Sequence, residues 1–134
     1  MQVRQKHPRV DATNRILIAE DHFDSREALT ALFEAFGYQV IQAANGREAV
    51  SRAATDHPDV LLMDIMMPEL DGFDASRAIR ALPNHRFTPI IAVTALEDAR
   101  ELAFQAGMND YVRKPVDIRG LLAKVSGWLS PTAV

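Results

Sequence analysis

The chain has 134 residues, of which 48% are hydrophobic and 25% charged, and its formal net charge at pH 7 is −3. This length suits a single domain, and the lack of cysteine excludes disulfides and thiolate metal sites. A mildly acidic chain offers no electrostatic reason to bind nucleic acid. Because the sequence has neither an apolar run of membrane-spanning length nor a signal peptide, we expect a cytoplasmic protein that binds neither nucleic acid nor membrane.

Short apolar runs alternate along the chain with segments of helical periodicity. After a flexible lead-in over 1–14, the apolar runs predict buried strands at 15–19, 38–42, 59–63, 89–93 and 110–113. The segments between and after them predict helices over 24–36, 45–53, 73–82, 97–106 and 118–129. Strands that alternate with helices predict an α/β fold, a doubly wound five-stranded parallel sheet with helices on both faces.

Capping signals mark the ends of several predicted helices. Asp24 with Glu27, and Asn45 with Glu48, have the spacing of a capping box at a helix N-terminus. Gly37 follows the first helix as its expected stop. For the last helix, the apolar spacing predicts a buried side made of Ile118, Leu121, Leu122, Val125, Trp128 and Leu129.

Polar residues stand where the predicted strands end. Glu20 and Asp21 follow the first strand, Asp64 the third, Thr94 the fourth and Lys114 the fifth. Ligands of doubly wound sheets bind beyond the carboxyl ends of the strands, so we expect these three carboxylates, one hydroxyl and one ammonium to converge at one edge.

Close carboxylates repel one another unless a cation lies between them. Mg²⁺ prefers oxygen ligands and usually keeps some water. Asp21 and Asp64 could supply carboxylate oxygens, Glu20 could act directly or through water, and the main-chain carbonyl of Met66 could supply another oxygen. The cluster therefore predicts a magnesium site.

The same cluster suits the transfer of a phosphoryl group, which needs positioning and charge neutralisation more than covalent chemistry. Lys114 can neutralise one phosphoryl oxygen as a point charge, and the Thr94 hydroxyl can hydrogen-bond another. Asp64 is then the candidate nucleophile, a role that carboxylates fill in aspartyl-phosphate enzymes.

Over residues 15–129, the chain resembles the CheY-like receiver domain of response regulators in two-component signalling. The resemblance lies in four fragments in order: ILIAED, LLMDIMMPELDGF, IIAVTA and DYVRKP. It implies a flavodoxin-like strand order 2-1-3-4-5 and a cis peptide bond before Pro115. It also implies these roles: Mg²⁺-binding acidic pair for Glu20 and Asp21, phosphoacceptor for Asp64, carbonyl ligand for Met66, switch residues for Thr94 and Tyr111, and phosphate contact for Lys114.

The resemblance further implies that a histidine kinase or a histidine phosphotransfer domain donates the phosphoryl group. Thr94 would then move toward the phosphate, Tyr111 would fill the vacated space from outside, and the surface of the fourth helix, fifth strand and fifth helix would change for a downstream target. We expect a monomer or weak dimer that assists its own phosphorylation and is not an enzyme. The apolar residues Met66 and Leu96 flank the site and cannot orient an attacking water, which predicts slow loss of phosphate.

Two other classes of protein are alternative interpretations of this sequence. A haloacid dehalogenase-type enzyme needs a second carboxylate where Met66 stands, and a flavodoxin-like cofactor binder needs glycine and small hydroxyl residues in place of Glu20, Asp21 and His22. A receiver excised from a hybrid histidine kinase and a pseudo-receiver that works without phosphorylation are the alternatives within the family. We expect the receiver domain to occupy 15–130 with no output domain.

Overall fold

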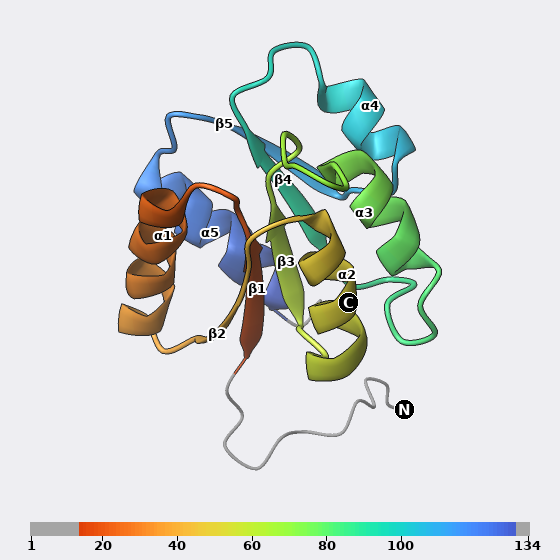
Figure 1. Cartoon of the computed structure of the whole chain (residues 1–134). Helices are drawn as coiled ribbons and strands as arrows, with labels where there is room; N and C mark the ends of the chain where they lie inside the picture. Colours follow the sequence, from red (N-terminus) through yellow and green to blue (C-terminus); the bar gives the residue numbers. More distant parts are fainter. Residues whose placement is uncertain (1–13, 131–134) are drawn as a thin grey trace.

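A parallel sheet in the order β2-β1-β3-β4-β5 forms the centre of the computed structural model, which describes residues 14–130 (Figure 1). The order of the strands matches the prediction. The strands are β1 (Arg15–Ala19), β2 (Gln39–Ala43), β3 (Val60–Met63), β4 (Ile90–Thr94) and β5 (Asp110–Arg113). The helices are α1 (Phe23–Ala35), α2 (Gly46–Asp56), α3 (Gly72–Arg80), α4 (Arg100–Gln105) and α5 (Ile118–Leu129). Of the predicted lead-in, all but Asn14 lies outside the described residues.

Every predicted strand is present within one residue of its expected bounds. The central strands β1, β3 and β4 are runs of apolar residues buried on both faces of the sheet, whereas the edge strands β2 and β5 are only partly buried. One core cluster packs α2, α3 and α4 against one face through small residues such as Ala53, Ala75 and Ala103. The other face is covered by α1 and α5 through Phe33, Leu121 and other apolar side chains. Figure 1 shows these two layers on either side of the sheet.

The N-terminus of α1 differs from the prediction. The helix begins at Phe23 with His22 as its N-cap, and the His22 side chain accepts a hydrogen bond from the Ser25 N–H. Asp24 lies inside the first turn, so the capping box predicted for it is wrong. The ring nitrogen of His22 supplies the acceptor that a helix N-terminus needs, and the helix therefore starts earlier than its acidic residue suggested.

The capping box of α2 is confirmed. Oδ1 of Asn45 accepts a hydrogen bond from the Glu48 N–H at 2.8 Å, and the Glu48 carboxylate accepts one from the Ala44 N–H at 2.7 Å. The two reciprocal bonds satisfy free donors at the start of the helix.

Helix α4 is shorter than predicted. It spans Arg100–Gln105, whereas Glu97 and Asp98 lie in an exposed turn and Asp98 adopts a positive φ of 56°. The N-cap, Ala99, has no side-chain oxygen to extend the capping of the helix. The loop between β4 and α4 is correspondingly long, which matters for the site at the end of β4.

The predicted buried side of α5 is only partly correct. Leu121 and Val125 are buried, but Ile118 is 54% and Trp128 41% exposed. The indole N–H of Trp128 donates a hydrogen bond to the Asp110 carboxylate at 2.9 Å. An indole with a polar partner at the surface is typical of this amphipathic side chain, and it places Trp128 at the rim of the helix contact.

Far from the sequence motifs, His85 connects the loop between α3 and β4 to helix α2. Its Nε2 lies 2.8 Å from the carbonyl oxygen of Ala53, and its Nδ1 lies 2.8 Å from Oγ1 of Thr88. Because a carbonyl only accepts, Nε2 carries the proton of the neutral ring and Nδ1 accepts from the Thr88 hydroxyl. The buried ring is thus fully hydrogen-bonded while it is uncharged.

We expect the protein to lose stability through His85 as the pH falls below about 6.5. Burial lowers the pKa of His85 from its usual 6.5, and the positive charges of His57 and Arg80 lower it further, outweighing the hydrogen bond to Ala53 and the charge of Asp59. The His85 ring therefore binds a proton more tightly in the unfolded chain than in the folded protein. The contribution of His85 to stability is complete above the unfolded-state pKa and is lost as the pH falls through the folded-state pKa.

Urea unfolding of the unchanged protein and of His85→Gln, at about pH 7 and about pH 5, measures this effect. The variant should lose less free energy of unfolding between the two pH values than the unchanged protein does. An equal loss in both proteins would show that other groups cause the pH dependence.

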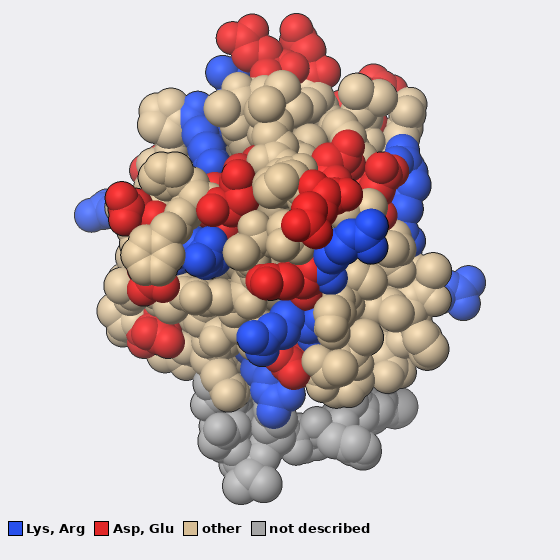
Figure 2. Space-filling model, in the orientation of Figure 1, with Lys and Arg blue, Asp and Glu red and all other residues tan. Residues whose placement is uncertain are grey.

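On the face seen in Figure 1, acidic and basic side chains are interspersed and not separated by sign (Figure 2). Some form ion pairs within a helix, such as Arg52 with Asp56 and Arg77 with Asp74. Such exposed pairs contribute little to stability. Over residues 14–130, none of the helices is both long and apolar enough to cross a membrane.

Candidate functional site

The loops after β1, β3, β4 and β5 meet at the carboxyl edge of the sheet, at the top of Figure 1. The pairing of Ala19 with Met63 places the residues that follow β1 and β3 side by side. The Asp64 N–H continues the ladder by donating to the Ala19 carbonyl at 3.0 Å. The sheet register therefore brings Glu20 and Asp64 together, as predicted.

Three carboxylates form a tight acidic cluster at this edge. An oxygen of Glu20, one of Asp21 and one of Asp64 all lie within 4.8 Å of one another. Glu20 is only 3% exposed and Asp64 only 6%, whereas Asp21 is exposed. Two carboxylates are thus held out of water beside a third that solvent reaches freely.

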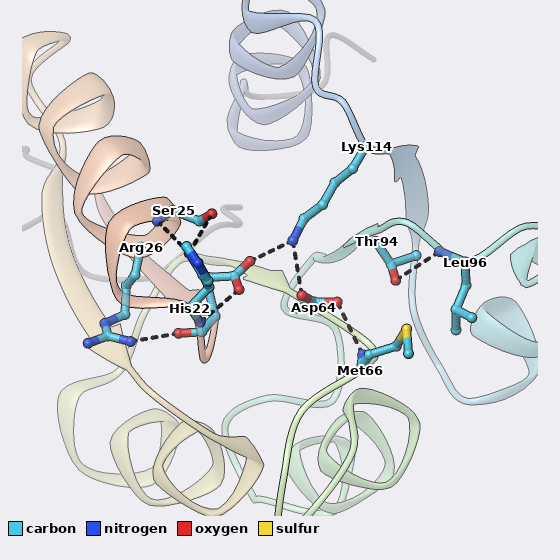
Figure 3. A network of polar contacts seen from close by, with 9 residues as sticks. His22, Ser25, Arg26, Asp64, Met66, Thr94, Leu96 and Lys114 are labelled. Atoms are coloured by element: carbon cyan, nitrogen blue, oxygen red, sulfur yellow. Dashed lines mark hydrogen bonds and ion pairs between the residues drawn. The ribbon is translucent and has the colours of Figure 1, made fainter.

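Lys114 neutralises part of this charge. Its Nζ lies 2.7 Å from a Glu20 oxygen and 3.1 Å from an Asp64 oxygen, and Figure 3 shows the side chain of Lys114 reaching toward Asp64. Burial alone would lower the pKa of Lys114, but hydrogen bonds to Glu20 and Asp64 and their charges outweigh burial and raise it. The ammonium therefore stays charged at neutral pH, and the predicted meeting of Lys114 with the acidic residues is found.

Backbone groups hold the carboxylates in place. The Met66 N–H donates to Oδ1 of Asp64 at 3.1 Å, and the His22 N–H donates to Oε2 of Glu20 at 3.0 Å. The Arg26 guanidinium donates to the carbonyl oxygen of Glu20 at 2.8 Å. Figure 3 shows these contacts around the cluster. The hydrogen bonds from Met66 and His22 therefore orient the two carboxylates at the edge of the sheet.

Gly72 closes the loop that carries Asp64. Its N–H donates to the Ile65 carbonyl at 2.8 Å. A Cβ at position 72 would lie 2.3 Å from the carbonyl oxygen of Asp64, which is backbone and cannot turn away. The close approach of α3 to this loop therefore requires glycine.

Thr94 and Tyr111 lie at the end of β4 and in β5, and Leu96 links them. Oγ1 of the buried Thr94 accepts a hydrogen bond from the Leu96 N–H at 3.3 Å. The hydroxyl of Tyr111 donates to the carbonyl oxygen of Leu96. The two predicted switch residues are thus both hydrogen-bonded to the backbone of the same loop residue.

The Tyr111 ring is buried in the core cluster and is 9% exposed. Its predicted movement when Thr94 moves stays a prediction. The hydrogen bond to Leu96 gives the hydroxyl a partner inside the protein, and a satisfied hydroxyl removes the main cost of burying tyrosine.

A surface groove of about 500 Å³ opens beside Asp64. It is lined by apolar side chains, among them Met66, Phe73 and Leu96, and by the carboxylates of Asp21 and Asp71. Met66 is 57% exposed there. No polar side chain other than these acids lines the groove within the described part of the chain.

Residues 16–126 match the family model of the response regulator receiver domain. The chain belongs to this family. The receiver is therefore a signalling domain of two-component systems, and such domains act between histidine kinases and downstream targets. Membership of this family excludes the interpretations as a haloacid dehalogenase-type enzyme and as a flavodoxin-like cofactor binder.

Relatives of the receiver differ in length. Protein PilH of Pseudomonas aeruginosa is 38% identical over 118 residues, which cover 87% of this chain and 98% of PilH. The sensor kinase/phosphatase CqsS of Vibrio cholerae is 37% identical over 118 residues, which are 86% of this chain but 17% of CqsS. Similar receivers thus occur both alone and within larger kinases.

Solved structures agree with the fold. The receiver domain of a sensor histidine kinase of Pseudomonas aeruginosa, with a magnesium ion in its active-site cleft, superposes with a TM-score of 0.81 at 41% identity and covers 87% of this chain and 98% of that one. The chemotaxis protein CheY4 of Vibrio cholerae superposes with a TM-score of 0.84 at 28% identity, covering 88% of this chain and 100% of CheY4.

Sequence reasoning did not identify three residues that support the site: His22, Arg26 and Gly72. His22 acts through its backbone N–H, Arg26 reaches a backbone carbonyl, and Gly72 acts through the side chain it lacks. A pattern of side chains carries no signal of such contacts. The predicted cis bond between Lys114 and Pro115 is present.

Proposed function

We propose that Asp64 accepts a phosphoryl group from a phosphohistidine of a histidine kinase or a histidine phosphotransfer domain. The observation that carries the proposal is the nearly buried Asp64 carboxylate, which contacts Lys114 at 3.1 Å and lies within 4.8 Å of two further carboxylates at the open edge of the sheet. The same arrangement disfavours a pseudo-receiver, because the three carboxylates converge and Lys114 contacts both Glu20 and Asp64.

The acidic cluster fits Mg²⁺. Carboxylate oxygens of Glu20, Asp21 and Asp64 converge, and hard oxygen ligands with one solvent-facing member suit an ion that keeps part of its water. These residues would hold the ion, together with the main-chain carbonyl of Met66. When bound, Mg²⁺ would neutralise charge that develops on the phosphoryl oxygens.

In the transfer step, a carboxylate oxygen of Asp64 forms a bond to phosphorus as the bond between phosphorus and the donor's imidazole nitrogen breaks. The imidazole leaves with that electron pair. Lys114 exchanges one of its contacts with a carboxylate for a contact with a phosphoryl oxygen. The Thr94 hydroxyl donates a hydrogen bond to another phosphoryl oxygen. Because Thr94 now accepts from the Leu96 N–H, its movement would free the loop after β4.

This loop leads to the surface formed by α4, β5 and α5, which we propose as the contact for a downstream target. Tyr111 and Arg113 lie on β5, and Leu102 on α4 is 52% exposed. The doubly charged acyl phosphate would change this surface through Thr94 and Leu96. The receiver is proposed to act as a monomer or weak dimer in the cytoplasm.

The test is intact mass after incubation with Mg²⁺ and acetyl phosphate, alongside Asp64→Asn. We expect the unchanged protein to gain one phosphoryl group, and we expect no gain in the variant or with a chelator. The variant keeps the size of the side chain but removes its charge, and its thermal unfolding tests whether it folds. A phosphoryl group on the variant would overturn the assignment of Asp64.

We also expect the phosphoryl group on Asp64 to be lost slowly. The groove beside Asp64 presents the apolar side chains of Met66 and Leu96, which cannot orient a water for attack. In the double variant Met66→Asn, Leu96→Glu, a polar group can do so, and loss should be about tenfold faster or more.

Intact mass followed over time after removal of the phosphodonor measures both rates. Phe87→Asn is a matched control, because Phe87 is equally apolar and 83% exposed but lies in the loop before β4, away from the groove. Rapid loss from the unchanged protein, or equal rates in the protein and the double variant, would contradict this explanation.

A further inference from the structure

Arg100, the first residue of α4, lies over two aromatic rings. Its guanidinium carbon is 5.7 Å from the centre of the Tyr111 ring and 5.6 Å from that of Phe104. Arg100 itself is exposed, and with Glu101, Phe104 and Gln105 it lines a surface hollow of about 370 Å³. Its side chain thus covers a buried tyrosine from the solvent side.

Tyr111 is therefore held at two points. Its hydroxyl donates to the carbonyl of Leu96, in the loop that begins at Thr94, and its ring lies under the guanidinium at the start of α4. A cation over the face of an aromatic ring is attracted by the ring's quadrupole. To leave its buried position, Tyr111 must give up both contacts.

We propose that Arg100 is a positioning residue that keeps Tyr111 buried before any phosphoryl group is present. The inference rests on the proposed role of Thr94 and Tyr111 as the switch. It means that the receiver is already biased toward the buried position, and that phosphorylation of Asp64 strengthens an existing preference. A partner that drew the Arg100 side chain away from the Tyr111 ring would lower the buried population of Tyr111, because the coupling between the two side chains is reciprocal.

The experiment follows Tyr111 directly. The chain has two tyrosines, so protein labelled with 3-fluorotyrosine gives two fluorine resonances, and Tyr38→Phe identifies that of Tyr111. The change in its chemical shift between H₂O and D₂O reports its exposure to solvent. In Arg100→Met, which keeps an apolar stem but removes the charge, we expect the exposed population of Tyr111 to rise roughly two- to five-fold.

Arg52→Met is the matched control, because it makes the same change at an exposed arginine of α2. It should leave the Tyr111 resonance unchanged. An unchanged solvent response in a folded Arg100→Met protein would overturn the proposal. A second measurement needs no Arg100 variant: the Nε–H resonance of Arg100 in the unchanged protein should show an upfield ring-current shift that Tyr111→Leu reduces, and an unshifted resonance would also overturn it.

A further experiment distinguishes a failure of the role proposed for Arg100 from a failure of the switch role proposed for Tyr111. Mg²⁺ and acetyl phosphate are added to the labelled protein and to Arg100→Met. A larger change of the Tyr111 resonance in Arg100→Met supports the proposed preference for the buried position, because a larger exposed population of Tyr111 then remains to be buried. If Arg100→Met exposes Tyr111 but neither protein responds to phosphorylation, the positioning role of Arg100 stands and the switch role of Tyr111 fails.

Discussion

Replacing Lys114 by methionine is expected to slow phosphorylation by acetyl phosphate about 100- to 1,000-fold, the usual effect of removing one donor aimed at developing charge. Nζ of Lys114 lies within 3.1 Å of both Glu20 and Asp64, so it already stands where the charge of an incoming phosphoryl group must be met. Methionine keeps much of the stem's length and apolar character. Intact mass measured over time gives the rate for each protein.

The same change should leave Mg²⁺ binding intact. Without the ammonium, Glu20 and Asp64 face each other with only a metal to neutralise them, so Mg²⁺ should raise the melting temperature of Lys114→Met at least as much as that of the unchanged protein. Lys124→Met is the matched control, because Lys124 pairs with Asp110 of β5 at 3.3 Å, away from Glu20 and Asp64. A normal rate in Lys114→Met would remove this lysine from the proposed mechanism.

Replacing Gly72 by alanine is expected to destabilise the fold by about 3 kcal/mol and to abolish phosphorylation of Asp64. The new Cβ would lie 2.3 Å from the Asp64 carbonyl oxygen and 2.7 Å from the Ile65 Cα. Both are backbone atoms, so the clash can be relieved only by moving the loop that carries the phosphoacceptor. Urea unfolding measures the loss of stability, and intact mass with acetyl phosphate measures the loss of the modification.

Gly127→Ala provides the control for this change. Gly127 lies in α5, and a Cβ there would have no atom within 4 Å. Alanine favours a helix over glycine, so this variant should be stabilised by roughly 0.5–1 kcal/mol and phosphorylated normally. If Gly72→Ala unfolds at the same urea concentration as the unchanged protein, the close approach of α3 to the Asp64 loop is wrong.

The sequence by itself determined the sheet, its strands and the identity of the residues at its carboxyl edge. Each of the central strands β1, β3 and β4 is a local run of apolar residues, so its pattern needs no knowledge of its neighbours. The predicted convergence of Glu20, Asp64 and Lys114 also followed, because parallel strands end at one edge. The resemblance to receiver domains added the strand order and the assignment of a role to each residue.

Only the tertiary structure decided how these residues contact one another. Lys114 bonds Glu20 and Asp64 across sequence separations of 94 and 50 residues, and such contacts depend on register and side-chain conformation. The early start of α1 depends on the His22 ring, and the buried Tyr111 contacts a carbonyl of Leu96 and the guanidinium of Arg100. Periodicity indicates which face of an element is apolar. It does not indicate which backbone groups or cations contact a side chain that is distant in the sequence.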